Sequence, residues 1–250
     1  MRTLFALLLL FILCLGTSAG HAQDAAAQAR QALQRLAATY RQPGPVSFDV
    51  LFRYAEPATP TRYLDTLRGQ FRLQAPRYWC RLDDQVSVYD GQVLLTIFPE
   101  DRLLHLSQPA SPTLPGNAVS LPDSFLLQYP ADRYTYTATS TEETVQLSLP
   151  AGGPCRQITW VIDRATGYLR RTESLVRADQ LYAPAEQPLV RDAASVYVHV
   201  EALYQHGQPA SFPAGLFDLQ QYVRKEGQAY VPLGDYAGYQ VFMASPALRR

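Results

Sequence analysis

Alternation of apolar and polar side chains constrains the fold of this chain more than any other sequence feature. The first such run covers residues 46–54 (VSFDVLFRY), and a second covers residues 67–73 (LRGQFRL). Successive side chains of a β-strand point to opposite faces of the sheet, so a period of two predicts strands with one apolar and one solvated face. We therefore expect a mainly β protein.

Further short strands follow at a spacing of roughly eight to twelve residues, with turn signals between them. Asp90-Gly91 predicts a two-residue hairpin, because glycine adopts the positive φ that such a turn needs. Asp83-Asp84 is better explained as another turn than as a pair of catalytic carboxylates. This succession predicts an antiparallel meander. The further predicted strands are 77–82, 85–89, 93–98, 102–107, 133–139, 144–149, 157–163, 168–177 and 195–205.

Two helices are expected beside the strands. Residues 24–40 carry apolar side chains at spacings of three and four, which predicts an amphipathic helix that ends before Pro43-Gly44-Pro45. Residues 121–129 predict a short helix with a proline in its first turn. No change in composition marks a second domain. We expect a single domain over 23–250, with an aromatic-rich, less periodic C-terminal extension at about 207–250.

The N-terminus has the pattern of a secretory signal peptide. Arg2 precedes an apolar run, 4–15, and small residues follow up to Ala22, so we expect cleavage after Ala22. The run is shorter than the roughly 20 residues that a membrane-spanning helix needs. Cys14 follows the bulky Leu13, whereas lipoprotein processing favours a small residue before its cysteine. We therefore expect a soluble mature protein outside the cytoplasm.

Charge and cysteine content narrow the functional classes. The 22 basic and 22 acidic residues give a formal net charge of zero. The chain therefore has no excess of positive charge that would attract nucleic acid. After removal of residues 1–22, Cys80 and Cys155 remain. In an oxidising compartment they can form a disulfide or stay as two buried thiols, and the sequence leaves both alternatives open.

Signals for catalysis are weak. His105, His199 and His206 remain in the mature chain, and no pair of them has the helical spacing of a metal site. Hydrolase-elbow, phosphate-loop and dinucleotide motifs are missing from the sequence. We expect no enzymatic activity, metal or cofactor. A secreted hydrolase would need His105 or His199 beside a buried carboxylate and a nucleophile.

An apolar sheet face of this extent needs a cover. The two predicted helices are too small to cover about ten strands, so the sheet either fills its interior with its own side chains or leaves an apolar cavity. Such a cavity would suit a hydrophobic ligand. The periodicity alone does not decide between these alternatives.

Two stretches resemble the periplasmic outer-membrane lipoprotein carriers of the LolA type. Residues 69–79 read GQFRLQAPRYW and residues 86–94 read VSVYDGQVL. The resemblance extends over about 24–205, with ITWVID at 158–163. It implies an incomplete, half-open antiparallel β-barrel with two or three helices and a helical lid over an apolar cavity. It also implies a monomeric periplasmic carrier that takes lipoprotein acyl chains, or another lipid, from an inner-membrane transporter to an outer-membrane acceptor.

The resemblance also suggests a set of site residues, for each of which ordinary core packing is the alternative. Trp79 matches the aromatic residue that follows the strand-ending proline in these carriers. The lid would present Leu33, Leu36, Phe125, Leu126 and Leu127. The cavity would be lined by Phe48, Val50, Phe52, Phe71, Leu73, Trp79, Val86, Val88 and Trp160.

One position departs from the carriers. They have an arginine immediately before that proline, which holds the lid by hydrogen bonds, whereas this chain has Ala75. Alanine has no side-chain donor, so we expect the lid to be held differently, while lipid binding need not change. The alternative function is an envelope sensor or adaptor that uses the same fold to regulate partner proteins.

Overall fold

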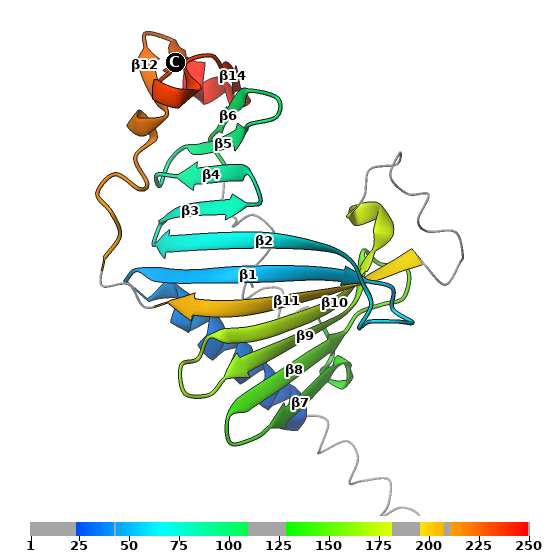
Figure 1. Ribbon diagram of the computed structural model, residues 1–250. Coiled ribbons are helices and arrows are strands. Elements are labelled where there is room, and N and C mark those ends of the chain that lie inside the picture. The colour runs from blue at the N-terminus through cyan, green and yellow to red at the C-terminus, as the bar shows by residue number, and fades with distance from the viewer. Residues whose placement is uncertain (1–23, 43, 110–128, 182–195, 208–210, 250) are drawn as a thin grey trace, which may run out of the picture. The chain divides into compact units, whose positions relative to one another are not determined.

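The computed structural model of the chain describes residues 24–42, 44–109, 129–181, 196–207 and 211–249. They include one α-helix, 24–41, and fourteen strands (Figure 1). The strands are β1 (Val46–Ala55), β2 (Tyr63–Gln74), β3 (Arg77–Leu82), β4 (Gln85–Tyr89), β5 (Leu94–Phe98), β6 (Leu103–Ser107), β7 (Tyr134–Ala138), β8 (Glu142–Ser148), β9 (Cys155–Asp163), β10 (Leu169–Arg177), β11 (Tyr197–Gly207), β12 (Val223–Glu226), β13 (Ala229–Pro232) and β14 (Gln240–Met243).

Twelve strands form one sheet in the order β14-β6-β5-β4-β3-β2-β1-β11-β10-β9-β8-β7, and β12 pairs with β13 separately. Pairing is antiparallel from β2 to β6 and from β7 to β10, whereas β14 runs parallel to β6. Among the described residues the sheet ends at β14 and at β7, so it is open. The expectation of a mainly β protein with a large antiparallel sheet is confirmed.

The predicted elements agree closely with those observed. Each strand predicted from the alternation is present, and the largest difference is at β2, which begins at Tyr63 rather than at residue 67. The first predicted helix is present over 24–41. The second, 121–129, lies outside the described residues except for Tyr129. The described part of the chain therefore has one α-helix where two or three were expected.

Both predicted turns are present. Asp83 has a φ of 50°, donates its N–H to the carbonyl of Arg68 and accepts the Arg68 N–H at Oδ1, which confirms the turn at Asp83-Asp84. In the β4–β5 hairpin, Asp90 N–H donates to the carbonyl of Val93. The two loop residues are therefore Gly91 and Gln92, one position later than predicted, with Gly91 at a φ of 109°.

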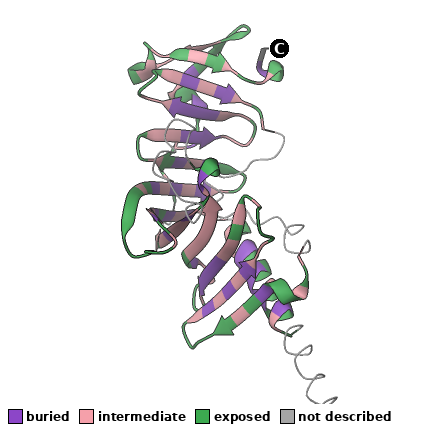
Figure 2. Cartoon of the chain, turned by 90° about the vertical axis from the view of Figure 1, so that its right-hand side faces the viewer, coloured by how far each residue is buried: buried purple, intermediate pink, exposed green. Residues whose placement is uncertain are grey.

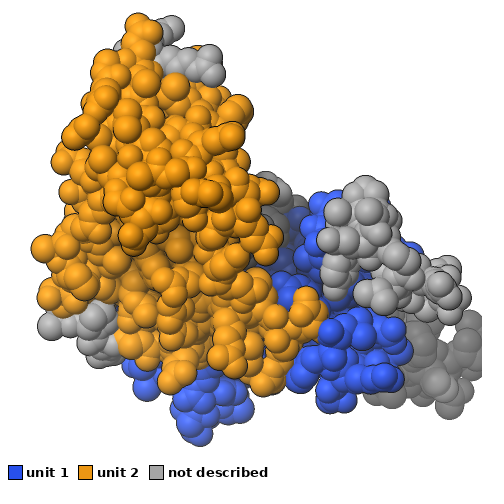
Figure 3. All heavy atoms as spheres, turned by 45° about the horizontal axis from the view of Figure 1, so that its top comes forward, with its two compact units in different colours: residues 1–39, 54–64, 121–202 blue, residues 40–53, 65–120, 203–250 orange. Residues whose placement is uncertain are grey.

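The chain divides into two compact units (Figure 3). Unit 1 comprises residues 1–39, 54–64 and 121–202, and unit 2 comprises residues 40–53, 65–120 and 203–250. Each unit draws on three separate stretches of chain, so the two are not successive domains along the sequence.

Unit 1 packs its helix against strands β7 to β9. Arg30 lies over the ring of Tyr134, and Arg35 forms an ion pair with Glu143 of β8. Burial alternates along β8, as expected for a strand with one covered face (Figure 2). The core of this unit includes Ala26, Ala29, Ala32, Leu33 and Leu36 of the helix and Tyr134, Val145, Leu147, Trp160, Ile162 and Leu169 of the strands.

In unit 2 the C-terminal extension covers one face of β4 to β6. The buried cluster there combines strand residues with three residues from the extension, and Trp79 of β3 packs against it. Strands β12, β13 and β14 of the extension have four residues each, too few to give a recognisable alternation. The buried members of this cluster, which we call the tail cluster, are Val88, Leu95, Ile97, Leu104, Leu106, Leu219, Val223 and Leu248.

The tail cluster predicts a large effect for a charge placed within it. Val223→Asp should lower the free energy of unfolding by about 3 kcal/mol, because it buries an unpaired carboxylate. The measurement is denaturant unfolding followed by tryptophan fluorescence. Gln228→Asp, at an exposed position between β12 and β13, is the matched control and should change stability little. Equal effects of the two substitutions would contradict this packing of the extension.

Candidate ligand-binding face

One face of unit 2 gathers aromatic and aliphatic side chains from four strands. The β2–β3 register places Phe71 opposite Cys80 and Leu73 opposite Tyr78, and the β3–β4 register places Tyr78 opposite Tyr89. Residues paired in this way point to the same side of a sheet. The ring of Phe48 in β1 stacks on Phe71, with centroids 4.9 Å apart and an interplanar angle of 13°. We call this surface, made of Phe48, Val50, Phe52, Phe71, Leu73, Tyr78, Cys80 and Tyr89, the aromatic face.

Tyr40, Tyr204 and His206 border the aromatic face beside Phe48. Their ring centroids lie 5.9, 6.0 and 5.4 Å from that of Phe48, respectively. Tyr40 Oη and His206 Nε2 are hydrogen-bonded at 2.8 Å. His206 was not among the site residues predicted from the sequence. The sequence signal that could have placed His206 on the same face as Tyr204 is its position two residues later on β11, because alternate residues of a strand share a face.

Charged side chains of the same strands lie on the opposite face. Arg72 pairs with Trp79 in the register, and its Nη1 lies 3.2 Å from Asp49 Oδ1. Arg81, next to Cys80, also lies on this opposite face, with its guanidinium over the ring of Trp79. Over 46–52, 69–73, 78–82 and 85–89, the residues on the aromatic side include no Asp, Glu, Lys or Arg. The register therefore separates an uncharged surface from a charged one.

The residues predicted to line one cavity fall into separate groups. Phe48, Val50, Phe52, Phe71 and Leu73 are all buried and share the aromatic face.

Trp79, Val86 and Val88 point the other way and contact the tail cluster, which corrects their assignment to the same surface. The physical reason is the pairing of Leu73 with Tyr78, which turns the neighbouring Trp79 to the opposite side.

The remaining predicted site residues belong to unit 1 or lie outside the described residues. Trp160 is buried between Val145 and Thr172 of the neighbouring strands. Leu33 and Leu36 are fully buried on the helix. Phe125, Leu126 and Leu127, predicted for the lid, lie outside the described part of the chain.

Ala75 lies in the tight turn between β2 and β3. Gln74 and Arg77 close this turn, and Arg77 Nη2 donates to Gln74 Oε1 at 3.1 Å. The Arg77 guanidinium lies 5.0 Å from the ring centroid of Phe217. The arginine beside this turn therefore contacts the C-terminal extension, a contact that the sequence did not suggest.

Among the described residues, the contacts of the two histidines considered for hydrolysis are an aromatic ring and a partly exposed carboxylate. His105 stacks on the ring of Phe242, with centroids 5.5 Å apart. His199 Nε2 lies 3.8 Å from Glu173, whose side chain is 31% exposed rather than buried. Within the described residues, no group of three or more His, Cys, Asp or Glu side chains could hold a metal ion. The helix in that part of the chain is not long and apolar enough to cross a membrane.

Cys80 and Cys155 are both free thiols in this structure, which is one of the two alternatives that the sequence left open. Burial raises the pKa of the Cys80 thiol to about 12. Burial also raises the pKa of Cys155, whose Sγ donates to the carbonyl of Gln157. Raised thiol pKa values reduce the thiolate fraction and hence the reactivity of both groups.

Thiol titration tests this assignment. In denaturant, Ellman's reagent should find both Cys80 and Cys155 reduced, and in the native protein the partly exposed Cys155 should react first. Cys80→Ser and Cys155→Ser variants assign the two phases. A denatured protein with no titratable thiol would contradict the structure.

A buried carboxylate anchors the helix of unit 1. Arg35 Nη2 lies 2.8 and 2.9 Å from the two oxygens of Glu143, and Tyr136 Oη donates to Oε1 at 2.8 Å. Burial raises the pKa of Glu143, but the hydrogen bonds from Arg35 and Tyr136 outweigh it, and the pKa is lowered overall. The charged form of Glu143 is therefore favoured in the folded protein.

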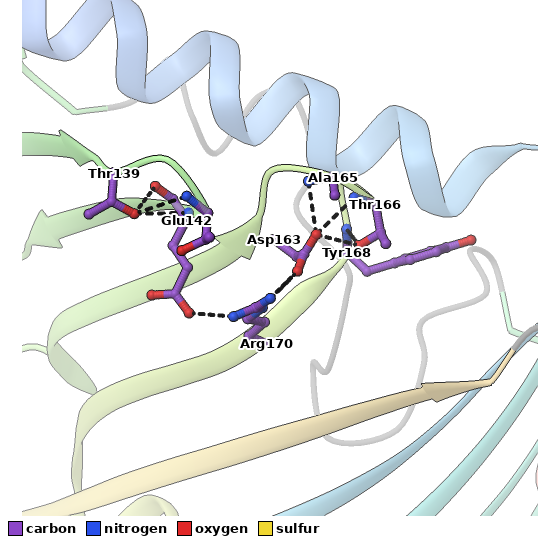
Figure 4. A network of polar contacts seen from close by, with 8 residues as sticks. Thr139, Glu142, Asp163, Ala165, Thr166, Tyr168 and Arg170 are labelled. Carbon is purple, nitrogen blue, oxygen red and sulfur yellow. Dashed lines mark hydrogen bonds and ion pairs between the residues drawn. The ribbon is translucent and has the colours of Figure 1, made fainter.

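Two hairpin turns beside this helix carry a polar network (Figure 4). The Asp163 Oδ1 accepts the backbone N–H groups of Ala165 and Thr166, and Oδ2 accepts from Arg170 Nε. Arg170 Nη1 donates to Glu142 Oε1 at 2.9 Å. Hydrogen bonds, first that from the Thr166 N–H, lower the pKa of Asp163. The network ties the β9–β10 turn to the β7–β8 turn.

The lowered pKa of Glu143 predicts how stability depends on pH. The folded-state pKa of Glu143 lies below the usual 4.5. The stability that its charged form contributes is therefore present above pH 4.5 and is lost as the pH falls through the folded-state pKa. Glu143→Gln should therefore reduce the loss of stability between about pH 5 and pH 3. Thermal unfolding between pH 5 and pH 3 measures this loss of stability, and Glu56→Gln, at an exposed position, is the control. An unchanged slope in Glu143→Gln would contradict the assignment.

Each unit has a groove among its described residues. The groove of unit 2, about 500 Å³, lies beside the β2–β3 and β4–β5 turns and is bordered by residues 212–218. The groove of unit 1, about 620 Å³, lies beside the helix and includes Arg35 and Glu143. None of the residues predicted to line an apolar cavity borders either groove.

Comparisons with known proteins find similarity to solved structures alone. No family model and no curated protein matches the chain. Its structure is similar to a LolA superfamily protein from Nitrosomonas europaea, with 14% identity and a TM-score of 0.33 over 76% of this chain and 96% of that one.

Two further solved structures are similar. For an uncharacterized conserved protein from Thermus thermophilus, identity is 9% and the TM-score 0.44, over 86% of this chain and 99% of that one. For the MucA/MucB complex of Pseudomonas aeruginosa, identity is 17% and the TM-score 0.35, over 76% of this chain and 60% of the matched chain.

Proposed function

We propose that this protein is a non-enzymatic carrier that shields the acyl chains of outer-membrane lipoproteins, or of a related lipid, between two membranes. The observation that carries the proposal is the aromatic face of unit 2. Four strands contribute to it, and over the ranges described above its side of the sheet bears no charged side chain. The ligand class comes from the resemblance of residues 69–94 to LolA-type carriers.

The hydrophobic effect favours burial of acyl chains against this face. Each methylene group removed from water contributes roughly 0.8 kcal/mol, so a protein that moves acyl chains through an aqueous space must cover them. The stacked rings of Phe48 and Phe71 are buried within this face, in the apolar surroundings that an acyl chain would need. Tyr40, Tyr204 and His206 add polar atoms at its border, where a ligand's polar end would remain hydrated.

The cellular setting of the proposal follows from the N-terminal signal. Cleavage after Ala22 would release the mature protein into the periplasm. There it would receive its cargo from an inner-membrane transporter and pass it to an outer-membrane acceptor. Ala75 cannot supply the lid hydrogen bonds of the known carriers, so release from this chain would use other contacts.

A photoreactive fatty acid tests the proposed face directly. A diazirine-labelled acyl chain should cross-link to alternate residues of β1 and β2, such as Phe48 and Phe71, and not to their neighbours Asp49 and Arg72. Fragment mass spectrometry of the wild-type protein reads the sites without any substitution. Cross-links spread equally over both faces would contradict the proposal.

Paired substitutions on β2 provide the second test. Leu73→Glu adds a charge to the aromatic face, while Gln70→Glu adds the same charge to the opposite face of the same strand. We expect Leu73→Glu to weaken uptake of a fluorescent acyl probe at least tenfold, about 1.4 kcal/mol, and Gln70→Glu to leave it unchanged. A wild-type protein that takes up no probe would favour the sensor or adaptor function instead.

A further inference from the structure

The groove of unit 1 is lined mainly by polar side chains. The helix contributes Gln28, Gln31 and Arg35, which lie on one side of it at spacings of three and four residues. The strands and the β9–β10 turn contribute Tyr136, Ala138, Glu143 and Arg164. The groove has a volume of about 620 Å³.

The carboxylate in this groove is already engaged by protein donors. Glu143 accepts two contacts from Arg35 Nη2 and a third from the hydroxyl of Tyr136, and its side chain is only 11% exposed. Arg35 is 50% exposed, so the rest of its guanidinium reaches the open side of the groove. Glu143 thus fixes the direction of Arg35 and leaves donors facing outward.

Arg164 is held in place on the other side of the groove. Its backbone N–H donates to the carbonyl of Thr141, and its Nη1 donates to the carbonyl of Thr139 at 2.6 Å. The preceding residue, Asp163, organises the turn through the network of Figure 4. Arg164 is therefore held by carbonyl groups of the neighbouring β7–β8 turn, and within the described part of the chain its guanidinium has no ion pair with an acidic side chain.

The side chains that line the groove carry a net positive charge. Two guanidinium groups, Arg35 and Arg164, face one carboxylate, Glu143, so the net charge is one positive. Guanidinium groups have only donors, and the amides of Gln28 and Gln31 can donate as well. A ligand that satisfies them must be an acceptor with negative charge.

We propose that the groove bounded by Arg35 and Arg164 binds a phosphate group. A tetrahedral phosphate presents oxygens in several directions and can meet donors from both sides of a groove, whereas a carboxylate presents two oxygens in one plane. The phosphate would come either from an anionic phospholipid headgroup or from free phosphate. This site goes beyond the proposed acyl-chain function and does not depend on it.

Calorimetric titration of the full mature chain with inorganic phosphate, at constant ionic strength, tests the site. We expect saturable binding that weakens about tenfold in Arg164→Gln, because one charge-assisted contact is lost. Arg156→Gln removes the same charge at an exposed position of β9 outside the groove and should bind like wild type. Arg164→Lys keeps the charge and should recover most of the affinity.

A second arm distinguishes the two sources of phosphate. Sedimentation with vesicles that contain phosphatidylglycerol should retain the protein if the headgroup is the ligand, with pure phosphatidylcholine vesicles as control. Vesicle binding that depends on Arg164, without binding of inorganic phosphate, would support the lipid source. Phosphate binding without vesicle binding would support the free ion.

The site would be overturned in two ways. Wild-type protein that binds neither probe would contradict it, and so would equal losses in Arg164→Gln and Arg156→Gln. Thermal unfolding of each variant checks that it is folded, and Arg164→Lys keeps the test valid if Arg164→Gln is unstable. Uptake of the acyl probe by Arg164→Gln should remain normal, which separates this result from any failure of the carrier proposal.

Discussion

The register of the β2–β3 hairpin decides which side chains meet in unit 2. Its closing pair, Gln74 and Arg77, sets every other pair along the two strands. A slip by one residue would turn each apolar side chain to the opposite face. Because Phe71 falls opposite Cys80 and Arg72 falls opposite Trp79, the uncharged and charged surfaces are separated across the thickness of one sheet. The aromatic face and the tail cluster both depend on this alignment.

The periodicity of the sequence was sufficient to predict strands β1 to β11 and the helix 24–41, but not what covers each face. A period of two tells which residues share a side within one strand, so Phe48, Val50 and Phe52 were correctly grouped. It does not tell how two strands align, and Trp79 was therefore assigned to the wrong side. His206 was missed for a related reason, since its neighbours Tyr40 and Phe48 come from distant parts of the chain.

Interactions over long sequence separations account for the rest of what the sequence did not reveal. Glu143 occupies an inward position of β8 where an apolar residue would be expected; Tyr136 donates a hydrogen bond to it, and the helix residue Arg35 is its charged partner. A buried carboxylate without that partner would be strongly destabilising. The C-terminal extension gave no periodic signal, because its packing uses isolated residues such as Leu219, Val223 and Leu248 rather than a continuous stripe.

The parallel pairing of β14 with β6 has a consequence for the order of folding during synthesis. At this edge the Gln240 N–H donates to the carbonyl of Arg102, just before β6, and the Ala244 N–H donates to the carbonyl of Leu106; both donors come long after β6 in the sequence. Until those residues emerge, the backbone of β6 and the apolar side chains of Leu104 and Leu106 lack their final cover. An exposed strand edge is a template for pairing with other chains. Chains that stop before β14 would thus leave this edge open to pairing with other chains, and β14 protects β6 against such aggregation.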